Sequence, residues 1–141
     1  MKRYSARAAV LVCCALILSS CMTVPDPSEI PADSTVVELS QKGQSALDAN
    51  NYKAAEVYYQ TIIDRYGTDA SARISAEFEI AHMRIKKEKW DDARIRLEAI
   101  ISAYETTGGT ALPPEYLVLA RNDLARIPEG KQTAPDANPT E

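Results

Sequence analysis

The segment NYKAA at residues 51–55 recurs in altered form as KWDDA at residues 89–93. In both segments an aromatic residue, Tyr52 or Trp90, is followed three positions later by an alanine. The offset is 38 residues, and bulky apolar residues follow both alanines in the same register. An aromatic that closes a tight turn and an alanine that lets two helices approach closely are typical of repeated helical pairs. The two segments therefore predict a repeated helical hairpin.

Helical periodicity extends from these segments in both directions. Apolar residues recur at spacings of three and four, and no alternating strand pattern is present. Thr35 and Glu38 have the spacing of a capping box, and Asp69 is the expected cap of a later helix. We expect five helices, which begin at Val36, at Tyr52, after Asp69, at Trp90 and at Pro114, with the last ending at Ile127.

The spacing of small residues resembles the tetratricopeptide repeat, which has a small residue at its eighth position and an alanine twelve residues later. Gly43 and Ala55 match these positions in the first repeat, and Ala81 and Ala93 match them in the second. The resemblance implies an all-α fold with two tetratricopeptide-like helical hairpins plus a C-terminal capping helix, a short α-solenoid. The 38-residue period is longer than the roughly 34 residues of the family.

A longer repeat that contains Ile-Ile-Asp-Arg-Tyr, here at residues 62–66, is similar to one subgroup of these proteins. That subgroup comprises the lipid-anchored repeat proteins of outer-membrane β-barrel assembly and the Tol-Pal-associated periplasmic proteins. The similarity implies a location in the bacterial cell envelope, at the outer membrane facing the periplasm.

The N-terminus has the features of a lipoprotein signal. Basic residues precede an apolar run at residues 8–18, which is too short to span a bilayer as a helix. The small pair Ser19 and Ser20 then precedes Cys21. This order resembles a bacterial lipoprotein signal, in which the cysteine is acylated and becomes the mature N-terminus. The alternative is an ordinary signal peptide with a chance cysteine.

Composition divides the chain into four parts. Residues 1–20 are the expected signal peptide, and residues 21–35 are expected to be the lipidated cysteine and a flexible, proline-rich tether. At about 3.1 Å per residue, such a tether could hold the folded part some 40 Å from the bilayer. Residues 36–127 form the expected helical domain, and residues 128–141 a disordered tail.

Charge and residue content exclude several functions. Loss of residues 1–20 changes the formal charge from −4 to −7, which makes nucleic acid a poor partner and leaves the lipid to hold the protein at the membrane. The chain has one histidine, His82, and its last cysteine is the acylated Cys21. Catalysis and metal binding need convergent groups of such residues. We therefore expect no enzyme activity, no metal and no cofactor.

The repeat resemblance implies a concave groove that binds protein. Its expected partner is an envelope protein or a peptide segment, and a second copy of the chain is a further candidate because two repeats leave an apolar face uncovered. The expected lining residues come from the first, third and last helices: Ser40, Gln44 and Asp48; Phe78, His82 and Ile85; Leu117 and Arg121.

Two other functions remain open from the sequence. One is a small-ligand-binding accessory lipoprotein of a transporter, in which Phe78 and His82 would hold the ligand. The other is a purely architectural subunit of an envelope complex.

Overall fold

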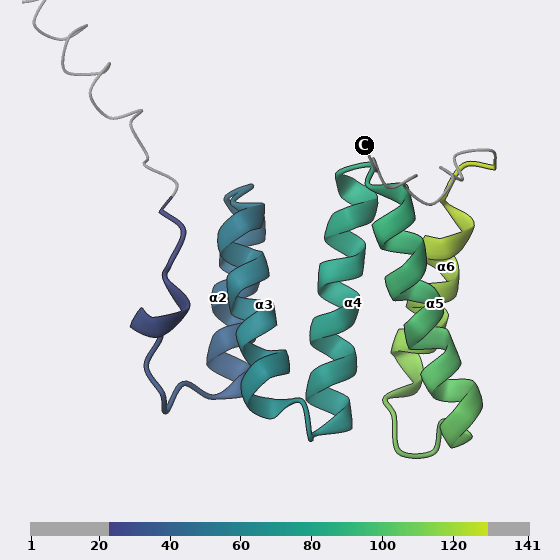
Figure 1. Cartoon of the computed structure of the whole chain (residues 1–141), viewed down its shortest axis with the longest axis horizontal. Helices are drawn as coiled ribbons and strands as arrows, with labels where there is room; N and C mark the ends of the chain where they lie inside the picture. Colours follow the sequence, from purple (N-terminus) through teal and green to yellow (C-terminus); the bar gives the residue numbers. More distant parts are fainter. Residues whose placement is uncertain (1–22, 130–141) are drawn as a thin grey trace, which may run out of the picture.

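The computed structural model describes residues 23–129, which form five α-helices and one short 3-10 helix without any strand (Figure 1). The α-helices begin where the sequence predicts, so the all-α prediction is confirmed; α6 ends two residues earlier than expected. Their bounds are α2 (Val36–Asp48), α3 (Tyr52–Tyr66), α4 (Ala70–Lys86), α5 (Trp90–Thr107) and α6 (Pro114–Ala125), with the 3-10 helix η2 at Pro27–Glu29. None of these helices is long and apolar enough to cross a bilayer.

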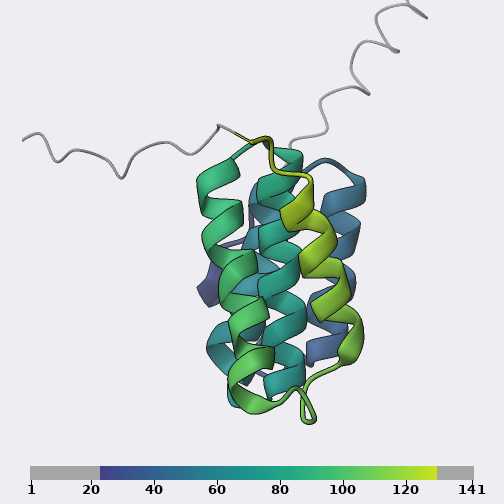
Figure 2. The same ribbon diagram turned by 90° about the vertical axis from the view of Figure 1, so that its right-hand side faces the viewer.

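The helices pack in chain order as two antiparallel hairpins and a final single helix. Helices α2 and α3 form the first hairpin, and α4 and α5 form the second. Helix α6 packs against both helices of the second hairpin, as the view along the stack shows (Figure 2).

The 38-residue repeat is present in the backbone of the two hairpin turns. Asn50 and Glu88 occupy equivalent positions, and both have a left-handed conformation, with φ of 58° and 54°. The next residues, Asn51 and Lys89, donate equivalent backbone hydrogen bonds to the carbonyls of Ala46 and Arg84, at 2.7 and 2.9 Å. The alanines that follow the turn aromatics are fully buried. The sequence pattern therefore specifies the same turn twice.

Predicted caps fix the helix starts. The Thr35 N–H donates to Glu38 Oε2 at 2.8 Å, and the Glu38 N–H donates to Thr35 Oγ1 at 3.2 Å, which completes the capping box. Asp69 Oδ1 accepts from the N–H groups of Ser71 and Ala72, at 2.9 and 3.1 Å. These bonds satisfy donors that a helix start otherwise leaves unpaired.

Helix α4 is the centre of the fold because it is buried on two faces. One face, together with α2 and α3, forms an apolar cluster; the other forms a second cluster with α5 and α6. The α4 residues of the first cluster are Ala72, Ala76, Ile80 and Met83, and those of the second are Ile74, Phe78, Ala81 and Ile85. Burial of this apolar area on both faces joins the two hairpins into one body.

The segment before α2 lies against α3, at the left of Figure 1, instead of forming the expected flexible tether. The Ile30 side chain is buried in the first apolar cluster. Arg65 donates to the carbonyls of Pro31 and Ile30, at 2.6 and 2.9 Å, and the Tyr66 hydroxyl donates to the carbonyl of Ser34 at 2.7 Å. The tether prediction is therefore wrong for residues 23–35, because side chains of α3 satisfy the backbone of this proline-rich segment.

Some predictions fall outside the described residues. The signal peptide (1–20) and Cys21 precede the described part, and residues 130–141 of the predicted tail follow it.

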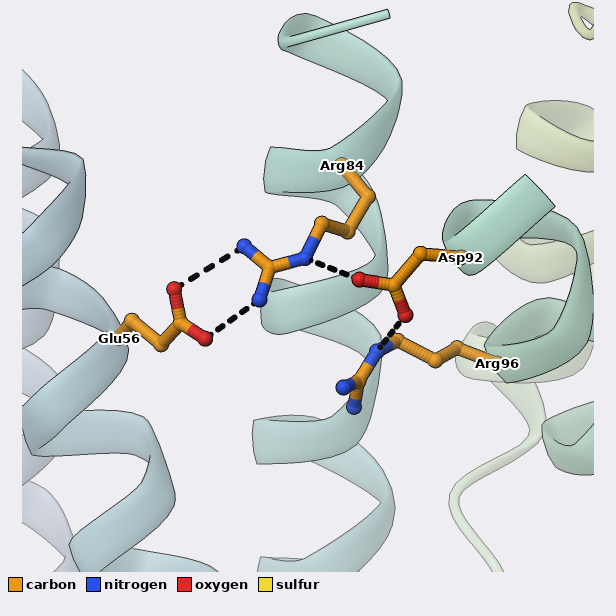
Figure 3. A network of polar contacts seen from close by, with 4 residues as sticks. All are labelled: Glu56, Arg84, Asp92 and Arg96. Atoms are coloured by element: carbon orange, nitrogen blue, oxygen red, sulfur yellow. Dashed lines mark hydrogen bonds and ion pairs between the residues drawn. The ribbon is translucent and has the colours of Figure 1, made fainter. Parts of the chain in front are cut away.

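Arg84 links the two hairpins through ion pairs (Figure 3). From α4, its Nε donates to Asp92 Oδ2 of α5 at 2.5 Å, while its terminal nitrogens donate to both carboxylate oxygens of Glu56 on α3. Arg96 completes the network by donating from its Nε to Asp92 Oδ1 at 2.6 Å. A single buried guanidinium thus connects three consecutive helices, with the paired geometry that arginine and carboxylates favour.

The network lowers the pKa values of its acids. Hydrogen bonds from Arg84 lower the pKa of Glu56. Burial by itself would raise the pKa of Asp92, but hydrogen bonds from Arg96 and Arg84 outweigh it and lower that pKa. Since both acids lose protons more easily in the folded state, they stabilise the fold above about pH 4.5, and this contribution is lost as the pH falls through their folded-state pKa values.

We predict that Arg84→Met lowers the free energy of unfolding by about 1 to 2 kcal/mol at pH 7, since both partner carboxylates are partly screened by solvent. The difference from the parent protein should begin to shrink below about pH 4 and should be lost as the pH falls through the lowered folded-state pKa values of both acids. Urea unfolding at several pH values measures this. As a control, Arg73→Met breaks the partly exposed pair with Glu77 and should change stability by less than about 0.5 kcal/mol. Equal stability of Arg84→Met and its parent at neutral pH would show that the network does not join the hairpins.

Candidate functional site

A polar cavity of about 300 Å³ lies between α2 and α6, with residues of α3 and α4 also in its lining. It is open to solvent and draws residues from both hairpins and from the final helix. The lining residues are Ser40, Gln41, Gln44, Tyr59, Ser75, Glu79 and Tyr116. We call this cavity the groove.

The α2 side of the groove carries short polar side chains. Ser40 and Gln41 lie on the same face of α2 as Gln44, which follows them by four and three positions. Gln44 donates from its Nε2 to Asp48 Oδ1 at 2.9 Å, which leaves the amide oxygen of Gln44 available as an acceptor.

Tyr59 reaches the groove from α3 because the residue opposite it on α2 is glycine. A Cβ atom at Gly43 would lie 2.7 Å from Cζ of the Tyr59 ring, closer than atoms can approach. Burial raises the pKa of the Tyr59 hydroxyl, and the negative charge of Glu79 raises it further. At neutral pH this hydroxyl is therefore a protonated hydrogen-bond donor.

Glu79 and Ser75 line the groove from α4, one turn apart. Glu79 is half-buried, and this burial raises the pKa of its carboxyl, although the charges of His82 and Lys86 act in the opposite direction. Tyr116 lines the groove from α6, and its ring contacts the Phe78 ring with centroids 5.6 Å apart. Burial, followed by the charges of Glu79 and Glu115, raises the pKa of the Tyr116 hydroxyl.

His82 lies beside the groove and pairs with α6. Its Nδ1 is 2.5 Å from Oδ2 of Asp123, a buried residue that also accepts a hydrogen bond from Arg126 at 3.0 Å. The His82 ring stacks on Phe78 with centroids 5.8 Å apart. These contacts fix α6 against α4, which sets the far wall of the groove.

The structure brings together part of the predicted site. Ser40 and Gln44 line the groove, and Asp48 borders it through its bond with Gln44. Arg121 is exposed on α6.

Three other predicted residues do not line the groove. Phe78 and Ile85 are buried in the apolar cluster of α4, α5 and α6, and Leu117 packs against that cluster. The repeat alignment predicts a concave surface at these positions, but α6 packs over this face of α4 and makes it part of the core. Phe78, Ile85 and Leu117 therefore contribute to packing and do not line this groove.

Sequence reasoning missed several groove residues. The missed residues are Gln41, Tyr59, Ser75, Glu79 and Tyr116. For Ser75 and Glu79 the signal is a polar stripe on α4, since Ser75, Glu79 and His82 follow at spacings of four and three. Gln41, Tyr59 and Tyr116 lie on three other helices, and this stripe gives no signal for them. The apolar stripe on the same helix, which includes Phe78 and Ile85, lies in the core.

A second cleft, of about 480 Å³, lies between α3 and α5. Its lining includes Gln60 and Ile63 of α3, and Ala99 and Ala103 of α5. Glu77 of α4 also lines it and pairs with Arg73, with 3.5 Å between their charged atoms. This cleft shares no lining residue with the groove. Among residues 23–129 no group of three or more histidine, cysteine or acidic side chains could hold a metal ion.

No protein-family model and no solved structure matches the chain. The chain is 41% identical over 110 residues to a protein of Treponema pallidum (strain Nichols) that is described as an uncharacterized protein. The match covers 78% of this chain and 44% of that protein, so the chain spans less than half the length of this relative. The description of the relative states no activity or partner.

We predict that Glu79→Gln raises the free energy of unfolding at pH 7 by up to about 1 kcal/mol. The folded-state pKa of Glu79 lies above its usual range, so ionisation weakens the fold as the pH rises from about 4 to 7. The gain from the substitution should therefore disappear below about pH 4. Glu77→Gln, which removes an ion-paired carboxylate from the same helix, should give no gain. Urea unfolding across this pH range measures both variants, and a loss of stability in Glu79→Gln would contradict the burial argument.

Proposed function

We propose that this protein is a lipid-anchored scaffold of a bacterial cell envelope that binds another protein through the groove. The observation that carries the proposal is the polar groove itself, which is built by residues from both hairpins and from α6. Its occupant would be an envelope protein or a peptide segment. A role in outer-membrane protein assembly at the periplasmic face follows from the subgroup resemblance and remains part of the proposal.

The repeated turn supports the tetratricopeptide-like reading of the fold. The two hairpins share a 38-residue offset in sequence and the same left-handed residue in their turns. The small residues at the close-packing positions, Gly43, Ala55, Ala81 and Ala93, are all buried. In such repeats, successive hairpins present one continuous surface to a partner.

The groove chemistry suits a polypeptide. Hydroxyl, amide and carboxylate groups from α2, α3, α4 and α6 offer both donors and acceptors to an extended main chain. Tyr59 and Tyr116 add amphipathic rings, which are common at protein interfaces. This arrangement lacks a nucleophile paired with a base, and we propose binding instead of catalysis.

The small-ligand alternative has less support. It relied on Phe78 and His82 as the residues that hold the ligand. Phe78 is buried in the core, and His82 is engaged with Asp123 and the Phe78 ring. An architectural subunit remains compatible with a protein-binding groove, and a second copy of the chain remains a candidate partner.

The N-terminal segment defines how a lipid anchor at Cys21 would orient the domain. The carbonyl of Thr23 accepts from Asn51 Nδ2 at 2.9 Å, at the turn between α2 and α3. One residue separates Thr23 from Cys21, which limits the distance between their Cα atoms to about 7 Å. The anchor would therefore hold the end of the bundle with the α2–α3 and α4–α5 turns close to the bilayer, not 40 Å away.

We predict that Cys21→Ser removes the protein from the membrane fraction or leaves it as an unprocessed precursor, since only this cysteine follows the small pair. Detergent-phase partitioning and the size of the product measure this. Cys13→Ser and Cys14→Ser alter cysteines within the apolar run and should leave processing unchanged. Normal processing and partitioning of Cys21→Ser would contradict the lipid anchor.

We predict that Ser40→Arg combined with Gln44→Arg reduces recovery of the partner at least tenfold, because two large cations would fill the α2 side of the groove. Chemical crosslinking in intact cells, followed by purification of the protein and identification of bound envelope proteins, measures this. Circular dichroism should show unchanged helicity, since Ser40 is half-buried and Gln44 exposed.

The control for this experiment places the same charges in the cleft between α3 and α5, as Gln60→Arg combined with Ala99→Arg. This variant should retain the partner. Retention by the groove variant together with loss by the cleft variant would place the interface on the cleft and overturn the proposal.

A further inference from the structure

Glu79 is the exception among the carboxylates that are shielded from solvent. Every other buried or half-buried carboxylate in residues 23–129 pairs with an arginine. The pairs are Glu56 and Asp92 with Arg84, Glu77 with Arg73, and Asp123 with Arg126. Glu79 makes no ion pair or hydrogen bond with any of the described side chains. A half-buried carboxylate without a partner lowers the stability of the folded state unless a positive group pairs with it.

The residues around Glu79 indicate what kind of group could pair with its carboxylate. Glu79 is the only charged side chain among the described residues that line the groove. Tyr59 and Tyr116 line the same cavity and lie close enough for the charge of Glu79 to act on their hydroxyls. Gln44 and Ser40 contribute further oxygen acceptors from α2.

We propose that the groove recognises a lysine or arginine side chain of the partner protein, with the cationic group of that side chain paired to the Glu79 carboxylate. This inference rests on the proposed function of the groove and names the chemistry of its occupant. The aliphatic stem of such a side chain would lie against the tyrosine rings, while its nitrogen atoms donate to Glu79 and to neighbouring oxygens.

Charge complementarity selects this occupant over the alternatives. An acidic side chain would meet the unpaired carboxylate as a like charge, and an apolar side chain would remove its remaining water without replacing the lost hydrogen bonds. A cation gains from the attraction, which is stronger in a partly enclosed cavity than in bulk water. The expected charge of −7 after loss of the signal peptide also favours the approach of a basic segment.

The test uses the full chain in a non-ionic detergent and a set of short peptides as probes. The peptides share the sequence acetyl-Gly-X-Gly-amide, in which X is lysine, arginine, norleucine or glutamate. Nuclear magnetic resonance titration should show saturable shifts at Tyr59, Ser75, Glu79 and Tyr116 with the lysine or arginine peptide. The norleucine and glutamate peptides should produce none at these residues.

Two variants make the result specific. Glu79→Gln keeps the shape of the side chain and should weaken binding of the lysine peptide at least tenfold, or about 1.4 kcal/mol. Glu77 is on the same helix but lines the cleft between α3 and α5, so Glu77→Gln should leave binding unchanged. Equal binding of the lysine peptide to Glu79→Gln and to the parent protein, or an absence of saturable shifts in the groove, would overturn the inference.

Partner recovery from cells separates this inference from the proposed function. Loss of the partner in both Glu79→Gln and the Ser40/Gln44 variant supports both. Loss in the Ser40/Gln44 variant alone supports a protein-binding groove but contradicts the pairing of a partner cation with Glu79. Retention of the partner in both variants rejects the groove as the interface.

Discussion

The fold depends on the burial of α4 on both of its apolar faces. Alanines and Ile80 and Met83 pack toward the first hairpin, while Ile74 and Phe78 pack toward α5 and α6. Because the two sets interleave along one helix, neither hairpin can shift along α4 without exposing apolar area on the other. Arg84 adds a polar link in the same place by pairing with acids on α3 and α5. Hairpin spacing, and with it the width of the groove, follows from this one helix.

The groove occupies the remaining side of α4, where the side chains are polar and α2 and α6 stand apart. The shape of the groove depends on specific contacts between helices. Gly43 lets the Tyr59 ring pack against α2, and the His82–Asp123 pair holds α6 in position. Glu79 is held within this frame without a partner of its own, so the folded state carries a cost that a positive group could relieve. The residue that weakens the fold is therefore the one on which we base the proposed chemistry of the partner.

Local signals made most of the fold predictable, whereas the groove depended on contacts between distant helices. Thr35, Asp69 and the aromatic-to-alanine spacing act within a few residues, and the helix starts and repeated turn follow from them. The position of α6 is not a local property. Its contact with α4 places Phe78 and Ile85 in the core, and the polar stripe through Ser75 and Glu79 remains for the groove. Similarly, proline content suggested a tether before α2, but Arg65 and Tyr66 bind that segment from α3.

Site-specific photocrosslinking in cells tests the central claim, that the groove is where this protein binds its partner. A photoreactive amino acid at Gln41 lies in the groove, and one at Glu98 lies exposed on α5. We expect a crosslinked protein of defined size from Gln41 and none from Glu98. A crosslink from Glu98 without one from Gln41 would contradict it.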